Sequence, residues 1–366
     1  MKKIIYIVST LKRSGPTNQL YNIIKYLDKN EFEPHLITLS PEPKDSRWND
    51  YETLGVNLYS LGLSRLQGFF SAKTKLKSLI FQINPDIIHT QGIRADVLSL
   101  KFIKSHIVIC TARNYPYHDY PSKFGFIRGI LMAYKHIAVL KKIKVVSCSR
   151  SIQDQLFQRG INSLVVQNGV DILNYKPLDN YEKLDFRRKV GIPEDSFIFI
   201  TVGSLILRKD VQTIINAFNN ANHVNKVHLL ILGDGYQLGL LKNLVNNDFV
   251  IFIGNVNNVA EYLQASDVFI SSSLSEGLPN TVLEAMACGL PCLLSDISSH
   301  NEIVEEAEWK FLCKDYMKLA SLMERIEKID ISILRANARE RIEENFDSRK
   351  MSEHYQNIYY KLLVDA

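Results

Sequence analysis

The sequence predicts an α/β protein built from two doubly wound parallel sheets, and three observations lead to this fold class. The chain has 366 residues, enough for two domains of ordinary size. Apolar runs alternate along it with amphipathic, helix-like stretches. The runs are continuously apolar, which is typical of strands covered on both faces of a parallel sheet. Because two such series occur, we expect two domains.

The first series predicts an N-terminal domain over 1–172, with helices such as 18–27 and 70–82. Its strands are expected at 3–9, 34–39, 86–89, 106–110, 143–147 and 164–167. The polar segment 173–195, which contains Pro177 and Pro193, predicts an irregular linker.

The second series predicts a C-terminal domain over 196–346. Its strands are expected at 197–203, 227–232, 249–253, 267–271 and 291–295. The segment 347–366 follows the completed second sheet, so we expect it to form a helix that crosses back to the first domain. Ligands of such sheets bind at the carboxyl ends of the strands, so the chemistry should lie in the loops that follow them.

Composition is that of a soluble globular enzyme, with 46% hydrophobic and 23% charged residues. No window approaches 18 consecutive apolar residues, so no membrane-spanning helix is expected. The short apolar run near the N-terminus has no cleavage site after it and predicts a strand, not a signal peptide. The five cysteines lack zinc-site spacing, which favours buried thiols in a reducing cytoplasm.

Charge is divided unevenly along the chain. Residues 1–170 contain 24 Lys and Arg against 11 Asp and Glu, whereas the remainder contains 20 against 28. We therefore expect the first half to face a polyanion, either an anionic membrane surface or a phosphate-bearing acceptor. Nucleic acid is disfavoured, because few aromatic residues interleave with the lysines and no recognised binding motif occurs.

The stretch from Glu276 to Glu284 is the most informative motif. It follows the apolar run 268–270 and a run of serines, and a helical pattern begins near its middle. Pro279 suits a first helical residue, which needs no amide hydrogen. Amides at a helix N-terminus suit an anion such as a diphosphate; here they belong to Gly277, Leu278, Asn280 and Thr281. The flanking carboxylates would accept hydrogen bonds from neutral hydroxyls, and diphosphate plus hydroxyls describes a nucleotide sugar.

Two further strand-end loops extend this candidate site. Arg208 and Lys209 follow the strand at 197–203, and two adjacent cations there could neutralise a diphosphate leaving group. Val256 lies in the loop after 249–253, a candidate for backbone contact with the nucleotide base. The glycines between 233 and 239 do not fit a dinucleotide-binding fingerprint and predict a tight strand-to-helix turn.

Candidate residues in the first half lie in the loops after its strands. Gly15, after the first strand, would let the backbone approach a ligand closely. His89 ends the strand at 86–89 and could be either a structural residue or part of the active site. Arg113 and His118 lie in an aromatic, charged loop after 106–110, which would suit an acceptor sugar.

With these motifs the sequence resembles the retaining nucleotide-sugar glycosyltransferases of family 4, which have the GT-B fold. The matching pattern is the Glu-x7-Glu stretch from Glu276 to Glu284, supported by Gly203 with Arg208 and Lys209. Further support comes from Asn168-Gly169-Val170-Asp171, Ser295-Asp296 and Glu302-Ile303-Val304.

The resemblance implies a role for each matching position. Glu276 would bind donor-sugar hydroxyls, Glu284 the ribose, and Arg208 and Lys209 the diphosphate. Amides from Leu278 to Thr281 would complete the phosphate site, and Gly15 would approach it from the other domain across a cleft. The sequence departs from the family mainly on the sugar and acceptor side, at Ser14, Ser204, Gln91 and Arg113.

The implied activity is retaining, metal-independent transfer of a sugar from a nucleoside-diphosphate sugar, with UDP-sugar favoured, to a saccharide acceptor. No cofactor is expected, and the chain has no Asp-x-Asp, the metal-nucleotide clamp of the other major glycosyltransferase architecture. The basic first half favours a lipid-linked acceptor at the cytoplasmic face of the membrane, in cell-surface polysaccharide synthesis. The alternatives are an epimerase or phosphorylase of the same fold, a non-catalytic subunit of a polysaccharide assembly complex, and a basic nucleic-acid binder.

Overall fold

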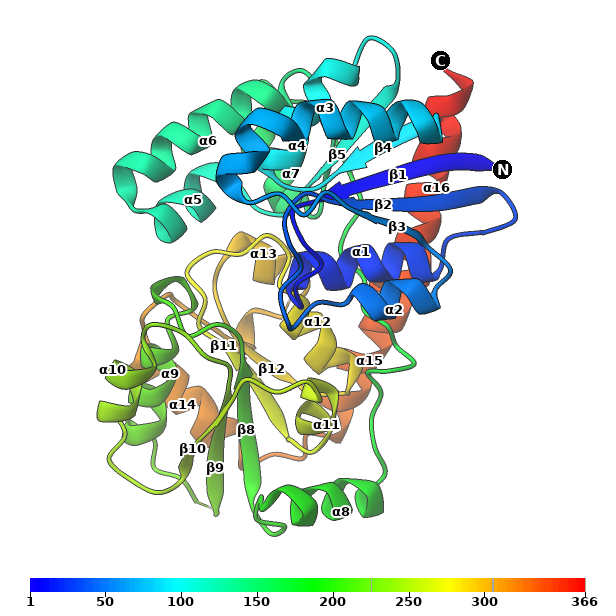
Figure 1. Ribbon diagram of the computed structural model, residues 1–366. Coiled ribbons are helices and arrows are strands. Elements are labelled where there is room, and N and C mark those ends of the chain that lie inside the picture. Colours follow the sequence, from blue (N-terminus) through cyan, green and yellow to red (C-terminus); the bar gives the residue numbers. More distant parts are fainter. Residues whose placement is uncertain (225, 305, 366) are drawn as a thin grey trace. The chain divides into compact units, whose positions relative to one another are not determined.

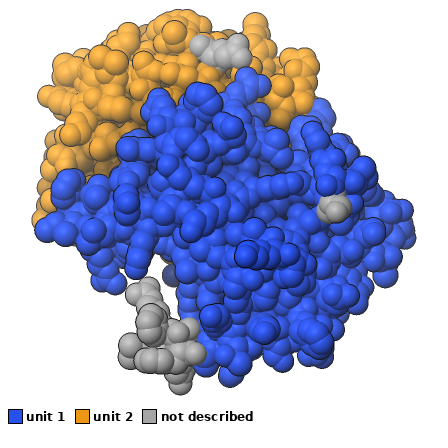
Figure 2. Space-filling model, turned by 90° about the horizontal axis from the view of Figure 1, so that it is seen from above, with its two compact units in different colours: residues 1–169, 348–366 blue, residues 170–347 orange. Residues whose placement is uncertain are grey.

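The structure is a computed structural model that describes residues 1–224, 226–304 and 306–365, with backbone alone for 65–70. It forms two compact units, one of residues 1–169 with 348–366 and one of residues 170–347 (Figure 2). Each unit is a parallel sheet with helices packed on it, which confirms the predicted α/β, doubly wound fold class (Figure 1).

The sheet of the first unit has seven strands within the described residues, in the order β3-β2-β1-β4-β5-β6-β7. The order reverses direction between β1 and β4, which makes the edge beyond these two strands a topological switch point. The bounds are β1 Lys2–Val8, β2 Phe32–Thr38, β3 Asn57–Ser60, β4 Ile87–Thr90, β5 Ile107–Ala112, β6 Lys144–Ser147 and β7 Ser163–Val165. Strand β3 was not predicted, because it is a short, largely exposed edge strand.

The helices of the first unit come from both ends of the chain. They are α1 Gly15–Lys25, α2 Trp48–Thr53, α3 Arg65–Ile83, α4 Ile93–Ser99 with the short η1 Leu100–Phe102, α5 Pro116–Phe124, α6 Phe126–Leu140, α7 Arg150–Phe157 and α16 Ser348–Val364. Tyr355 and Tyr359 of α16 are fully buried in the same core as Ile4 and Tyr6 of β1. The last helix therefore completes the core of the first unit.

The sheet of the second unit has six strands within the described residues, in the order β10-β9-β8-β11-β12-β13. Its switch point lies between β8 and β11. The strands are β8 Phe197–Val202, β9 Val227–Leu232, β10 Val250–Gly254, β11 Val268–Ser271, β12 Cys292–Ser295 and β13 Lys310–Phe311. The helices are α8 Asn180–Val190, η2 Leu207–Lys209, α9 Val211–Asn220, α10 Leu238–Asn243, α11 Val259–Gln264, α12 Asn280–Ala287, α13 Ser298–Asn301, η3 Ala307–Trp309, α14 Tyr316–Ile326 and α15 Ser332–Asn345.

The segment 173–195 differs from the irregular linker expected there, because it contains helix α8. Asp179 caps this helix by accepting a hydrogen bond from the Glu182 amide at 2.8 Å. Lys183 and Arg187 reach Asp267 at 2.5 and 2.9 Å, which holds α8 onto the second unit. The polar composition that suggested a linker reflects this ion-paired surface.

No helix in the described part of the chain combines the length and the hydropathy needed to cross a bilayer.

Candidate active site

The predicted cations and the first predicted carboxylate meet at the switch point of the second unit. Arg208 and Lys209 lie in η2, directly after β8, and Glu276 follows β11. Strands β8 and β11 are hydrogen-bonded neighbours, although more than 60 residues separate them in sequence. In doubly wound sheets this edge is where ligands bind.

The loop that carries the cations is held by the loop after β11. The Ser272 hydroxyl donates to the Asp210 carbonyl at 2.8 Å, and the Leu274 amide donates to the Arg208 carbonyl at 2.8 Å. Asp210 has a left-handed backbone (φ 48°), which ends η2 and turns the chain into α9. The serine run that follows β11 therefore supplies hydrogen bonds to carbonyls of the cationic turn.

Both cations contact the same carboxylate. Glu276 Oε2 lies 2.8 Å from Arg208, and Oε1 lies 2.7 Å from Lys209. The Glu276 side chain is only 8% exposed. Burial by itself raises its pKa, but Lys209 and Arg208 outweigh burial and lower the pKa to about 2. Glu276 is therefore ionised at physiological pH and balances two positive charges.

A network of polar side chains lies next to Glu276. The Ser273 hydroxyl donates to Glu276 Oε1 at 2.8 Å, and the nearby Ser271 hydroxyl lies 3.3 Å from His300 Nε2. His300 is fully buried, and its Nδ1 donates to the Ser295 carbonyl at 2.7 Å. Burial lowers the pKa of His300 to about 4, so the ring is neutral and its Nε2 accepts a hydrogen bond. Sequence reasoning missed Ser273 and His300.

Glu284 lies in the second turn of α12, in a setting unlike that of Glu276. Its side chain keeps partial exposure, but burial raises its pKa to about 7 despite the opposing effect of Lys209. It also hydrogen-bonds the Tyr175 side chain, which was missed because the segment around it read as a linker. Glu284 is therefore divided between its two protonation states near neutral pH.

Helix α12 begins at Asn280, as expected, but Pro279 is its N-cap and not its first helical residue. The backbone from Gly277 through Thr281 forms the entry to this helix, next to Glu276. The Arg208 side chain also donates to the Ser275 carbonyl, so the cation is tied to the same entry. An anion at this position would meet the positive end of the helix dipole and two cations.

Glycines let the loops after β8 and β9 pack directly on one another. A Cβ on Gly233 (φ 133°) would lie 1.9 Å from the Gly203 carbonyl oxygen, and a Cβ on Gly235 would lie 2.2 Å from the Leu205 carbonyl oxygen. Gly203 itself faces the Lys209 side chain, because a Cβ there would lie 3.3 Å from Lys209 Cε. These glycines therefore serve close loop packing, consistent with the tight turn expected from the sequence.

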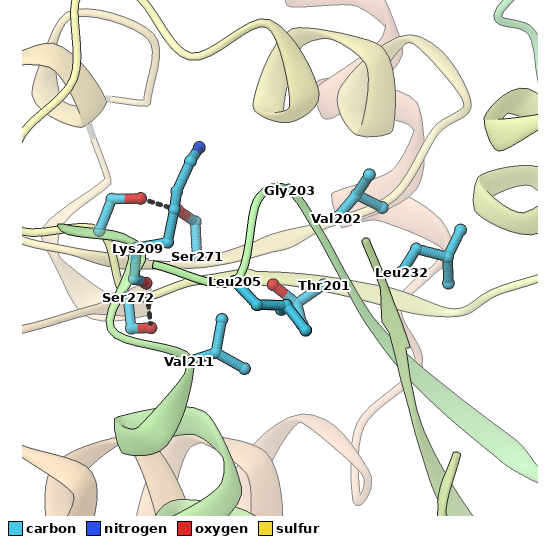
Figure 3. A pocket seen from close by; sticks show the side chains of 10 residues that line it. Thr201, Val202, Gly203, Leu205, Lys209, Val211, Leu232, Ser271 and Ser272 are labelled. Atoms are coloured by element: carbon cyan, nitrogen blue, oxygen red, sulfur yellow. Dashed lines mark hydrogen bonds between the residues drawn. The ribbon is translucent and has the colours of Figure 1, made fainter. Parts of the chain in front are cut away.

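A small cavity of about 10 Å³, room for a single water, lies under these loops. Polar side chains gather on one side of it, including Lys209, Ser271 and Ser272, whereas Val202 and Leu232 lie on the other (Figure 3). Val256, the candidate for base contact, lies in the loop after β10, the edge strand of this sheet. Within the described residues, no cluster of three or more His, Cys, Asp or Glu side chains is placed to hold a metal ion.

The candidates of the first unit lie at the carboxyl edge of its own sheet, with one exception. Gly15 is the first residue of α1, after β1. Arg113 follows β5 and donates to Asn168 Oδ1 at 2.7 Å and to Gln91 Oε1 at 3.3 Å. His118 is exposed in α5, with its ring 5.0 Å from that of Tyr115.

His89 is the exception, and of the two roles left open by the sequence its surroundings favour the structural one. It is fully buried within β4, and both ring nitrogens have partners, Tyr359 at 2.8 Å and Thr111 at 2.7 Å. Burial lowers its pKa to about 3. His89 therefore joins the sheet to α16 and is not presented to an acceptor.

Two family models match the chain in succession. The model described as glycosyltransferase family 4 matches residues 13–172, and the model described as glycosyl transferases group 1 matches residues 182–347. Together they cover most of the two units, but not β1 or α16.

Several proteins of similar sequence or structure are named as glycosyltransferases or were solved with a nucleotide bound. The O-antigen biosynthesis glycosyltransferase WclY of Escherichia coli is 26% identical over 374 residues, covering 100% of this chain and 99% of the relative. A UDP-Gal:alpha-D-GlcNAc-diphosphoundecaprenol alpha-1,3-galactosyltransferase of Escherichia coli is 26% identical over 300 residues, covering 76% of each chain. The crystal structure of Anabaena HepE in complex with UDP and glucose has the same fold, with a TM-score of 0.81, 18% identity and coverage of 99% of this chain and 100% of the other.

Proposed function

Because the chain is a glycosyltransferase of the GT-B fold, we propose that it transfers a sugar, with retention, from a UDP-sugar to a saccharide hydroxyl without a metal. The observation that carries the donor assignment is the convergence of Arg208 and Lys209 on Glu276 at the N-terminus of α12. Relatives named for O-antigen synthesis and for UDP-galactose support this choice of donor and setting.

Donor binding would exchange the partners of the two cations. Glu276 balances Arg208 and Lys209, and a diphosphate would bring negative charge of its own to the same place. As the cations turn toward the phosphates, the Glu276 carboxylate becomes available to the hydroxyls of the donor sugar. Its pKa of about 2 keeps it an acceptor of hydrogen bonds throughout.

Leaving-group stabilisation would supply most of the catalysis. The difficult step separates a diphosphate from an oxocarbenium-like carbon, and negative charge grows on the bridging oxygen. Arg208, Lys209 and the helix dipole of α12 oppose that charge in a largely buried site, where electrostatic stabilisation is strongest. In a retaining transfer, the acceptor attacks from the face that the diphosphate leaves, and a phosphate oxygen takes the acceptor proton.

Glu284 would bind the ribose hydroxyls of the nucleotide. With a pKa of about 7, it accepts their hydrogen bonds best once deprotonated. Ribose binding would therefore lower its pKa and release a proton near neutral pH.

The proposed acceptor is a lipid-linked saccharide at the cytoplasmic face of the membrane, in cell-surface polysaccharide synthesis. It is supported by the excess of 24 Lys and Arg over 11 Asp and Glu in residues 1–170, and by the relative whose name includes a diphosphoundecaprenol acceptor. The exposed His118 and the Arg113 loop remain acceptor candidates in this proposal, and Gly15 remains a donor-phosphate candidate.

The test is the conversion of UDP-sugars in the presence and absence of lipid-linked saccharides extracted from membranes. We expect release of UDP that depends on the acceptor, persists in EDTA, and gives a product with the donor's anomeric configuration by NMR. Conversion of the donor without an acceptor would instead indicate an epimerase. Absence of any conversion, with the donor still bound, would indicate a non-catalytic subunit.

A further inference from the structure

Helix α6 turns an apolar stripe to solvent. Ile127, Leu131 and Tyr134 are 77%, 64% and 68% exposed, and their spacing of four and three residues places them on one face of the helix. Phe126, 77% exposed, begins the same helix. Contiguous exposed apolar side chains of this kind mark an interaction surface more often than isolated ones do.

The opposite face of α6 is anchored, so folding of the unit does not use the stripe. Gly129 packs so closely on α5 that a Cβ would lie 2.4 Å from backbone atoms of Pro121. His136 bridges Asp96 of α4 at 2.8 Å and Tyr120 of α5 at 2.6 Å. Helices α5 and α6 form a hairpin, side by side in Figure 1. The stripe is therefore held on a fixed element.

Positive charge borders the stripe. Residues 120–153 contain seven Lys and Arg and no Asp or Glu. Arg128 and Lys135, seven residues apart in α6, lie along one edge of the stripe, and Lys142 follows in the turn after the helix. In the described part of the chain no salt bridge pairs any of these three with a carboxylate, although Arg128 lies 5.9 Å from the Phe124 ring.

We propose that the outer face of α6 lies in the interface of an anionic lipid bilayer. An apolar stripe with a cationic border and no acidic residue is the pattern of an interfacial helix. With 15 residues, α6 is about 22 Å long, too short to span a hydrocarbon core of about 30 Å. A protein partner or a second copy would explain the stripe but not the absence of Asp and Glu from residues 120–153, which contain it.

This surface would also serve the proposed function. Its connection with a lipid-linked acceptor rests on that proposed function. Helix α5, which holds His118, packs against α6, so bilayer contact would bring the acceptor-side loop close to lipid headgroups. Binding itself requires no catalysis, so it can be measured independently of the reaction.

The cationic border is tested by flotation of the full chain with phosphatidylglycerol–phosphatidylcholine vesicles at low salt. Each surface cation contributes about fivefold in partitioning (~1 kcal/mol), so Arg128→Gln/Lys135→Gln/Lys142→Gln should weaken binding on the order of 100-fold. The matched control is Lys73→Gln/Lys75→Gln/Lys77→Gln, which removes the same charge from the exposed face of α3 in the same unit. We expect it to retain most of the binding, because among the described side chains of α3 a single large apolar one, Phe81, is exposed near these lysines.

The apolar stripe is tested by Leu131→Ser against Phe157→Ser on α7, since the two side chains are 64% and 67% exposed. We expect roughly tenfold weaker vesicle binding for Leu131→Ser and little change for Phe157→Ser. No flotation of the wild type, or equal losses in the controls, would overturn the proposal. So would a wild-type dimer, seen by sedimentation without vesicles, that Leu131→Ser dissociates. UDP affinity measured without vesicles should be unchanged in all four variants, which separates this surface from the donor site.

Discussion

Lys209 Nζ lies 2.7 Å from Glu276 Oε1, so the loop after β8 and the loop after β11 are joined by an ion pair at the switch point of the second unit. Arg208 contacts the other oxygen of the same carboxylate. The site thus contains its own counter-ion, which an incoming diphosphate would replace. Donor binding and catalysis, as proposed above, both depend on this exchange.

Glu276→Gln should separate nucleotide binding from turnover. Without the carboxylate, Arg208 and Lys209 lose their counter-ion, so UDP should bind at least as tightly as in the wild type. Turnover should fall about 100-fold, because the charged acceptor of the donor-sugar hydroxyls is lost. Calorimetric titration with UDP and steady-state kinetics measure the two effects, with Glu308→Gln, in a surface ion pair with Arg325, as the control. A variant that retains full turnover would remove Glu276 from the mechanism.

Glu284 should make stability fall as pH rises toward neutrality. Its pKa is about 7 in the folded protein against 4.5 ordinarily, so the folded state binds its proton more tightly. This contribution is complete below pH 4.5 and is lost as pH rises through 7, by roughly 2–3 kcal/mol. Melting temperatures of the wild type and Glu284→Gln should therefore diverge between pH 5 and 8. Parallel profiles over that range would contradict the pKa assigned to Glu284.

Gly233→Ala should disrupt the loops under the cations. The added Cβ would lie 1.9 Å from the Gly203 carbonyl oxygen, and a φ of 133° is itself unfavourable for alanine. We expect a loss of more than about 2 kcal/mol in the free energy of unfolding, together with weaker UDP binding. Gly239→Ala, in α10 with open space around its Cβ position, should instead stabilise by roughly 0.5–1 kcal/mol. Urea denaturation compares the two, and equal effects would refute the packing argument.

His89→Ala should act on the stability of the first unit and not on donor binding. The substitution leaves the hydroxyls of Tyr359 and Thr111 without their ring partner in a fully buried site. We expect a loss of about 3 kcal/mol or more in the free energy of unfolding, with UDP affinity unchanged. Denaturation and calorimetry test this. A variant of normal stability that fails only in turnover would return His89 to the acceptor side.

Sequence patterns predicted the elements that repeat apolar residues at a regular spacing, which are the buried strands and the amphipathic helices. Continuous apolar strands identified both sheets, and the cations and Glu276 could be sought at strand ends because parallel strands end at one edge. Strand β3 and helix α8 escaped detection because a partly exposed edge strand and a polar, ion-paired helix lack the apolar period.

The direction in which an individual side chain points could not be predicted from the sequence. His89 could have faced the core or the loop edge, and only the packing of α16, more than 250 residues away, encloses it. The contribution of His300 also depends on tertiary structure, because β11 and β12 must pair before Ser271, Ser295 and this ring can meet. The serine run after β11 is the signal in the sequence that points to this polar cluster.

Calorimetric titration of UDP and a panel of nucleotide sugars tests the donor site most directly, in the wild type and in Arg208→Gln/Lys209→Met. The matched control is Arg188→Gln/Lys189→Met, an adjacent Arg-Lys pair on α8 of the same unit, in surface ion pairs. We expect the wild type and the control to bind, and the double variant of the site to bind at least 100-fold more weakly. Failure of every nucleotide to bind the wild type, or equal affinity in the Arg208→Gln/Lys209→Met protein, would show that these cations do not form the donor site.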